Sequence, residues 1–93
     1  MTVEQYIECG NKAYNEKKYD EAIKNFKRAI DKNPGCIIAF VNLGNAFSQQ
    51  GKYDKAIKNY KRAIEIFPEY AEAFINLGNV YSDQGKYDEA IKS

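Results

Sequence analysis

Apolar residues recur at intervals of three and four in two adjoining runs of the chain. The first run is "CIIAFVNLGNAFSQQ", residues 36–50, and its apolar face holds Phe40, Leu43, Gly44 and Phe47. The second is "YDKAIKNYKRAIEIF", residues 53–67, and its apolar face holds Ala56, Ile57, Tyr60, Ala63 and Ile64. This spacing places the apolar side chains of each run on one face of a helix. The pattern predicts two amphipathic helices on either side of Gly51.

The whole pattern repeats with a period of 34 residues. Between 18–30 and 52–64, 11 of the 13 residues are identical, and the same sequence begins a third time at Lys86. A period of this length is typical of stacked helical hairpins. We therefore predict one all-helical domain over residues 1–93, with complete repeats at 3–36 and 37–70 and a truncated repeat at 71–93.

Glycine, proline and one lysine mark the expected turns. Gly51 and Gly85 stand where the first helix of a repeat should end in a left-handed residue, which glycine adopts without a Cβ clash. Lys17 occupies the equivalent place in the first repeat and should adopt the same conformation at a cost. Pro34 and Pro68 close each unit, because proline interrupts an incoming helix.

A second set of glycines recurs inside the first helices, at Gly10, Gly44 and Gly78. Glycine inside a helix costs about 1 kcal/mol relative to alanine. Close approach of the two helices of a hairpin would offset that cost, with Gly44 facing Ala56 and Ala63. The same approach is expected in all three repeats.

These residues at these spacings resemble the tetratricopeptide repeat, and the resemblance covers residues 3–93. It implies an all-α, right-handed solenoid of helix-turn-helix units that acts in non-catalytic protein–protein interaction. The first repeat departs from the pattern with Cys9, Ala13 and Lys17 in place of a leucine, an aromatic residue and a glycine. Cys9 is expected to be a small buried residue on the packing face.

The resemblance also implies that the first helices line a concave groove. Its predicted peptide-binding residues are Ile7, Asn11, Tyr14, Val41, Asn42, Asn45, Gln49, Ile75, Asn76 and Asn79. A carboxamide both donates and accepts hydrogen bonds, so a row of asparagines could hold the backbone of an extended peptide from a partner protein. This arrangement is similar to the asparagine ladder of domains attached to O-linked N-acetylglucosamine transferases. Repeat ancestry alone could equally account for the asparagines.

The groove that grips acidic chaperone tails matches the sequence less well. Ile7 and Glu72 stand where that groove uses lysine, and Asn76 stands where it commonly uses a basic residue. We therefore expect a partner other than a chaperone tail.

The truncated third repeat suggests a second kind of contact. From Lys86 onward the sequence has only eight residues, too few for a stable second helix on its own. The predicted self-association surface consists of Phe74, Leu77, Tyr81, Tyr87, Ala90 and Ile91. Three explanations stay open: a homo-oligomer formed by stacking or by helix exchange around Gly85, a fragment of a longer repeat array, or the targeting region of a larger enzyme.

Composition and charge argue against other classes of partner. Fourteen basic and thirteen acidic residues give a formal charge of +1, which favours neither nucleic acid nor anionic membrane. The second helices carry a basic ridge, Lys24, Lys27, Arg28, Lys58, Lys61 and Arg62. Acidic residues three or four positions away are expected to pair with it along the helix. With no long apolar block, the sequence suggests a cytoplasmic protein.

The sequence offers little for catalysis. It has no histidine, which removes the usual general base and the commonest metal ligand. Cys9 and Cys36 lack a close metal-ligand spacing and suit unpaired thiols in a reducing compartment. No serine has an evident base beside it, and "GNAFSQQGK" lacks the spacing of a phosphate-binding loop. We expect neither enzymatic activity nor a cofactor or metal.

Overall fold

A computed structural model describes the backbone of residues 1–92 and the side chains of residues 1–86. That part of the chain forms five α-helices and no strand. The helices are α1 (Val3–Asn15), α2 (Tyr19–Lys32), α3 (Ile37–Gln49), α4 (Tyr53–Ile66) and α5 (Ala71–Lys92). The all-helical prediction is therefore confirmed.

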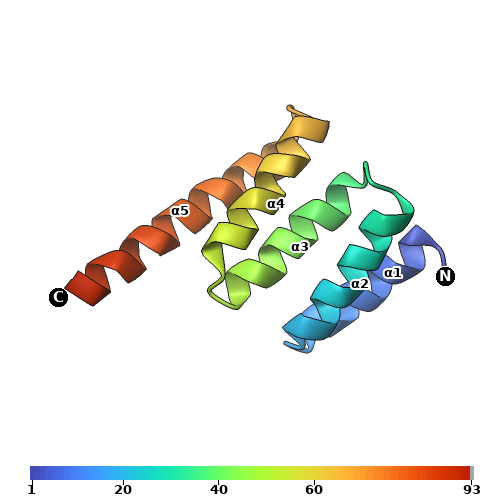
Figure 1. The fold of residues 1–93 in the computed structure, drawn as a ribbon, viewed down its shortest axis with the longest axis horizontal. Coiled ribbons are helices and arrows are strands. Elements are labelled where there is room, and N and C mark those ends of the chain that lie inside the picture. The colour runs from blue at the N-terminus through green and yellow to red at the C-terminus, as the bar shows by residue number, and fades with distance from the viewer. Residues whose placement is uncertain (93) are drawn as a thin grey trace.

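The helices stack as antiparallel hairpins along one direction (Figure 1). α1 pairs with α2 and α3 pairs with α4, while α2 also packs on α3 and α4 on α5. The first helices begin at Val3, Ile37 and Ala71, which are 34 residues apart. Each element therefore buries its apolar face only against its neighbours in the stack.

The turn within each complete hairpin has the conformation that the sequence predicts. Lys17 has φ 62° and Gly51 has φ 73°. After each of them the chain closes a similar hydrogen bond, from the Lys18 amide to the Ala13 carbonyl at 2.8 Å and from the Lys52 amide to the Phe47 carbonyl at 2.9 Å. These bonds satisfy carbonyls that the end of the first helix would otherwise leave without a partner.

Replacing Lys17 by glycine is expected to stabilise the fold. A side chain held in the left-handed region costs about 1 kcal/mol, which glycine avoids. The free energy of unfolding, measured in urea, should rise by about 1 kcal/mol, whereas Lys17→Ala, which keeps the Cβ atom, should give no such gain. A stability of Lys17→Gly equal to or below that of the wild type would contradict this explanation.

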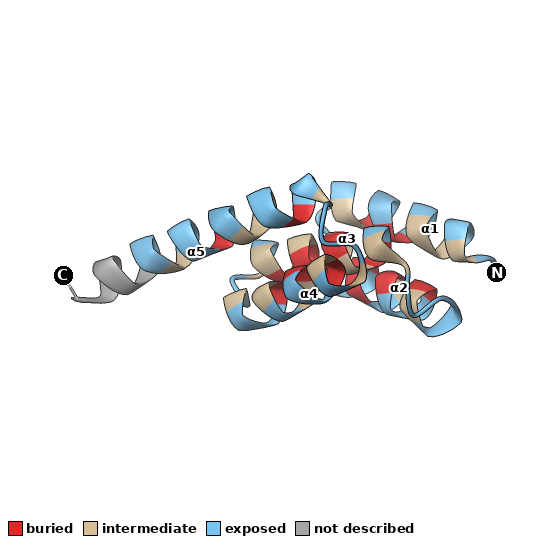
Figure 2. Ribbon diagram, turned by 90° about the horizontal axis from the view of Figure 1, so that it is seen from above, coloured by how far each residue is buried: buried red, intermediate tan, exposed pale blue. Residues whose placement is uncertain are grey.

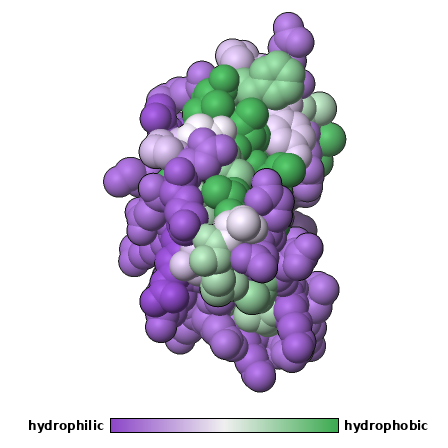
Figure 3. All heavy atoms as spheres, turned by 90° about the vertical axis from the view of Figure 1, so that its right-hand side faces the viewer, coloured by the Kyte–Doolittle hydropathy of each residue, from purple (hydrophilic) through white to green (hydrophobic). Residues whose placement is uncertain are grey.

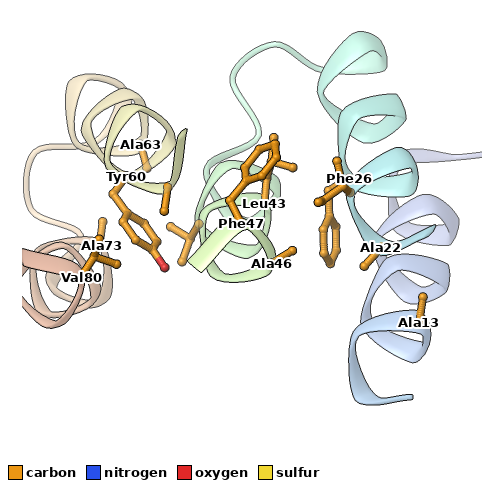
Figure 4. Packing of buried hydrophobic residues seen from close by; sticks show 13 residues of the cluster. Ala13, Ala22, Phe26, Leu43, Ala46, Phe47, Tyr60, Ala63, Ala73 and Val80 are labelled. Carbon is orange, nitrogen blue, oxygen red and sulfur yellow. The ribbon is translucent and has the colours of Figure 1, made fainter. Parts of the chain in front are cut away.

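The core is one continuous cluster that runs through the stack from α1 to α5 (Figure 2). Its largest fully buried side chains are rings from the second helices, and buried alanines on both helices of each complete hairpin let those helices approach closely. Phe26 and Tyr60 are 0% and 1% exposed. Figure 4 shows Phe26 beside α1 and α3, and Tyr60 near Val80 and Ala73 of α5. Each ring therefore joins its own hairpin to the next repeat.

Close approach explains the glycines of the two complete hairpins, although the neighbour is an aromatic ring and not the alanines that we predicted. A Cβ atom on Gly10 would lie 2.4 Å from Phe26 Cε1, and one on Gly44 would lie 2.6 Å from Tyr60 Cε1. The ring of the second helix thus occupies the space that a side chain on the first helix would need. Only glycine fits under it.

The third repeat does not form the predicted turn. α5 continues through Gly85 to Lys92, so the left-handed helix end predicted at Gly85 is wrong. The close approach predicted at Gly78 is wrong for the same reason, because a Cβ atom there would have nothing within 4 Å. α5 therefore presents an open face where α1 and α3 are covered.

Two further expectations about side chains are corrected. Cys9 is exposed, not buried on the packing face, whereas Cys36 is half-buried. Of the ion pairs expected along the basic ridge, the described side chains form one, Arg62 to Glu65 at 3.0 Å. The other basic residues of the ridge are exposed, where an ion pair gains little over separate hydration, and the Lys27 ammonium lies 5.8 Å from the centroid of the Phe47 ring.

Candidate amide groove

The first helices form the inner side of the stack. α1 contacts α3 and α3 contacts α5, whereas α2 and α4 do not contact each other in the described part of the chain. In a curved stack, elements on the inner side lie closer together than those on the outer side. The face built by α1, α3 and α5 is therefore the concave one.

Two adjoining hollows lie on this face, and together they are called the amide groove. The larger, of about 200 Å³, is lined by Tyr14, Asn45, Ser48, Gln49, Tyr60, Asn76, Asn79, Val80 and Asp83. The smaller, of about 40 Å³, is lined by Asn11, Tyr14, Phe26, Asn42 and Asn45. They share Tyr14 and Asn45, so the groove runs across all three repeats.

Asparagines join successive repeats by hydrogen bonds. Asn42 donates through Nδ2 to Asn11 Oδ1 at 3.2 Å, and Asn76 donates in the same way to Asn45 Oδ1 at 3.1 Å. Each bond spans 31 residues and links one first helix to the next. The asparagines therefore have a structural role in repeat stacking in addition to any role in binding.

Tyr60 adds a hydroxyl to the floor of the groove. Its O–H donates a hydrogen bond to Asn45 Oδ1, which thus accepts from both Tyr60 and Asn76. Burial raises the pKa of Tyr60 far above its ordinary value near 10, and the charges of Tyr14 and Glu72 raise that pKa further. The neutral hydroxyl is the form that the fold requires.

The raised pKa of Tyr60 predicts a loss of stability at alkaline pH. The unfolded state releases this proton near pH 10 and the folded state only at higher pH, so stability is complete below pH 10 and falls above it. By about pH 11 the free energy of unfolding of the wild type should fall by roughly 1 kcal/mol from this cause, whereas Tyr60→Phe has no such proton to release and should not show this fall. The stability gap between the two proteins should therefore shrink between pH 8 and pH 11 in urea unfolding. Parallel pH curves would contradict this prediction.

The structure places most of the predicted groove residues on the concave face, with one exception among the apolar ones. Val41 is 1% exposed and belongs to the core, so its assignment to the groove is wrong. Ile7 is half-buried and Ile75 is 62% exposed. The side chain of Val41 fills the space between helices, because burying its apolar surface there stabilises the fold more than leaving it exposed in the groove would.

Tyr60 and Val80 line the groove although we did not predict them there. The sequence contains an indication for Tyr60. Segments 18–30 and 52–64 differ at only two positions, and one of these is the replacement of Phe26 by Tyr60. A tyrosine in place of a buried phenylalanine usually indicates a hydrogen-bond partner near the ring edge. Val80 gave no comparable signal.

An apolar hollow lies elsewhere, at the loops between repeats. It measures about 350 Å³ and is lined by Cys36, Ile37, Ile38, Phe67 and Tyr70. Seen from the side on which α1 and α2 lie, hydrophobic atoms gather in the upper half of the molecule and hydrophilic atoms surround them (Figure 3). The polar side chains among its lining residues are those of Cys36 and Tyr70, and the Tyr70 hydroxyl donates a hydrogen bond to Glu72.

Membrane-spanning helices and metal sites are both absent from the described residues. None of the helices there combines the length and the apolar character that crossing a membrane would require. No three metal-ligating side chains in that part of the chain gather to hold an ion.

Comparison with known proteins identifies the family. The model of the TPR repeat matches residues 10–51 and again residues 44–85. No curated protein matches the sequence. A crystal structure of MamA is 32% identical with a TM-score of 0.86, and the match covers 98% of this chain and 53% of that one. This chain thus spans about half the length of the MamA chain.

Two other similar structures are isolated domains. The second TPR of Spaghetti (RPAP3), bound to the HSP90 peptide SRMEEVD, is 27% identical with a TM-score of 0.86, and the match covers 99% of this chain and 85% of that one. The Sgt2 TPR domain from Aspergillus fumigatus is 28% identical with a TM-score of 0.86, and the match covers 92% and 57%. Fold and groove thus define a protein built from stacked helical hairpins. The chain belongs to the tetratricopeptide repeat family.

Proposed function

We propose that this chain is a non-catalytic module that binds an extended peptide of a partner protein in the amide groove. The observation that carries the proposal is the row of carboxamides along the concave face, of which Asn79 makes no hydrogen bond within the described residues. Asn45 and Asn11 use Oδ1 for repeat stacking, which leaves their Nδ2 groups to donate. The groove therefore offers hydrogen bonds to a peptide backbone without requiring particular side chains.

Similar domains support the same kind of ligand. The first and second TPR domains of Spaghetti (RPAP3) are 26% and 27% identical to this chain, and both were solved with the peptide SRMEEVD. The two hollows of the groove are lined mainly by carboxamide, hydroxyl and carboxylate side chains, so a peptide held there would bury little apolar surface. Affinity should therefore depend on hydrogen bonds, each contributing about 0.5 to 1.5 kcal/mol.

The test selects peptides of about twelve residues from a random phage-displayed library and measures them against two variants. Asn79→Ala should weaken binding about three- to tenfold, which is the loss of one such hydrogen bond. Asn59→Ala is the matched control, because Asn59 lies on α4 and bonds the Lys55 carbonyl of its own helix. Equal affinity of Asn79→Ala and the wild type, or failure to select any peptide, would refute the proposal.

Asn45 is less suitable for this test than Asn79. Asn45→Ala would leave the buried Tyr60 hydroxyl and Asn76 without their common acceptor. An unsatisfied buried donor costs about 1 to 3 kcal/mol, so the variant would lose stability and binding together.

A second candidate function, self-association, is favoured by the open face of α5. Tyr81 is 46% exposed, whereas Phe47 at the equivalent position of α3 is 6% exposed. Gly78 is likewise exposed where Gly44 lies under a ring. The segment that would cover this face is residues 86–92 of a second copy. Its sequence, "KYDEAIK", is identical to that of residues 18–24, which include the start of α2, the helix that packs against α1.

Light scattering over a concentration series tests this exchange between copies. The wild type should shift from monomer to dimer as concentration rises, and Tyr81→Asp should abolish the shift. Ser82→Asp adds the same charge one residue along α5 and should leave the shift intact. A wild type that stays monomeric at every concentration would refute self-association.

A further inference from the structure

The two faces of the molecule carry different charges although the net charge is close to zero. Residues 3–15, 37–49 and 71–84 hold four carboxylates and one basic residue, Lys12. In contrast, α2 and α4 hold eight basic and five acidic residues. The formal charge of +1 therefore hides an acidic first-helix face opposite a basic second-helix face.

Two of the four carboxylates, Asp83 and Glu8, lie in the groove or in its register. Asp83 lines it directly. Glu8 is equivalent by the 34-residue period to Asn42 and Asn76, which line the groove in the next two repeats. Glu4 and Glu72 are equivalent to Ile38, which lines the apolar hollow, so they stand beside the groove and not in it. One acidic side chain or more thus stands at each end of the row of asparagines.

The field of Glu72 reaches the groove floor. Its carboxylate accepts a hydrogen bond from Tyr70 Oη at 3.1 Å. Burial, that hydrogen bond and the charge of Glu72 all raise the pKa of Tyr70, and the same charge contributes to the raised pKa of Tyr60. A negative charge that disfavours tyrosinate at two positions equally favours a cation placed between them.

No basic side chain neutralises this face within the described residues. The ion pairs found there are Lys18 with Glu16 and Arg62 with Glu65, and neither involves a groove carboxylate. Lys12 belongs to a separate hollow that it shares with Cys9 and Glu16. The four carboxylates are exposed and available to a ligand.

We propose that the groove selects extended peptides that carry lysine or arginine, in contrast to the acidic peptide bound by the similar Spaghetti domains. The inference rests on the proposed function and adds the charge of the ligand to it. Asparagines would hold the peptide backbone, and Glu8, Glu72 and Asp83 would attract its basic side chains. The attraction is between exposed charges, so it should weaken as salt shortens the screening length.

The test uses three fluorescein-labelled peptide pools of about twelve residues, alike except for lysine, glutamine or glutamate at every third position. Fluorescence anisotropy is measured at about 50 mM and about 300 mM NaCl. The lysine pool should bind about tenfold more tightly than the glutamate pool at low salt, and most of that difference should vanish at high salt.

Two double variants with the same change in net charge locate the effect. Glu8→Gln with Glu72→Gln should weaken the lysine pool about three- to tenfold and leave the glutamine pool within about twofold. Asp31→Asn with Glu65→Gln, on the second-helix face, should leave all three pools unchanged. Circular dichroism verifies that both variants remain helical.

The outcomes separate this inference from the proposed function. Equal or tighter binding of the glutamine or glutamate pool would overturn the charge preference and leave a peptide-binding groove. Equal loss in both double variants would also overturn it, because net charge alone would then explain the effect. Failure of every pool to bind would overturn the inference and the proposed function together.

Discussion

Gly44→Ala is expected to lower the free energy of unfolding by about 2 kcal/mol, the typical cost of overpacking a buried site. The added Cβ atom would stand 2.6 Å from Cε1 of Tyr60, far inside van der Waals contact. The ring has little room to move, because Tyr60 is 1% exposed and its hydroxyl bonds Asn45. Either the helices separate or the ring leaves its site, and both outcomes disrupt the joint between repeats.

Gly78→Ala is the matched control for this substitution. Gly78 is equivalent to Gly44 by the 34-residue period, but no atom lies within 4 Å of a Cβ atom built there. Alanine in an open helix position should raise stability by about 1 kcal/mol over glycine. Urea unfolding of both variants measures the two effects under one condition. A loss of stability in Gly78→Ala would show that a helix covers α5 after all.

The second large contrast concerns Gly51 and Gly85, which are also 34 residues apart. Gly51 has φ 73°, so Gly51→Ala should destabilise the protein by about 1 to 2 kcal/mol. Gly85 lies within the continuous helix α5, so Gly85→Ala should stabilise it by about 1 kcal/mol. The midpoints of thermal and urea unfolding should therefore fall for Gly51→Ala and rise for Gly85→Ala. If both lose stability alike, α5 turns at Gly85 and the straight helix is wrong.

Local signals were sufficient to predict the two complete hairpins from the sequence. The 3.6-residue periodicity, the 34-residue offset and the turn at Gly51 each depend on residues close together in the chain. They predict helices within residues 36–50 and 53–67 and a left-handed Lys17, and the structure shows α3, α4 and that conformation of Lys17. Local preference and packing agree at these places, which is why a reading of one sequence succeeds.

The third repeat could not be predicted in the same way because its local and packing signals disagree. "KYDEAIK" at residues 86–92 has the sequence of a second helix, but whether the chain turns before it depends on how much surface the turn would bury. The wrong predictions for Val41 and Cys9 have a similar cause. A helical position at the border of the apolar face becomes core or surface according to the neighbouring helix, which the sequence does not place.

The asparagines of the groove illustrate a different limit. Their spacing predicted a row on one face, and the structure shows that row. It also shows Asn42 and Asn76 donating to the preceding repeat, a contact between residues 31 apart that the periodicity did not suggest. A carboxamide has both donors and acceptors, so one side chain can join repeats and still offer hydrogen bonds to a ligand.

Nuclear magnetic resonance of side-chain amides tests the binding role of the groove most directly. The chain carries its own control, because Asn25 and Asn59 on the second helices donate to carbonyls of their own helices. On titration with a peptide selected from the random library, the Nδ2 resonances of Asn11, Asn45 and Asn79 should shift and those of Asn25 and Asn59 should not. Shifts confined to Asn25 and Asn59, or bound peptide with no shift in the groove amides, would contradict the proposed function.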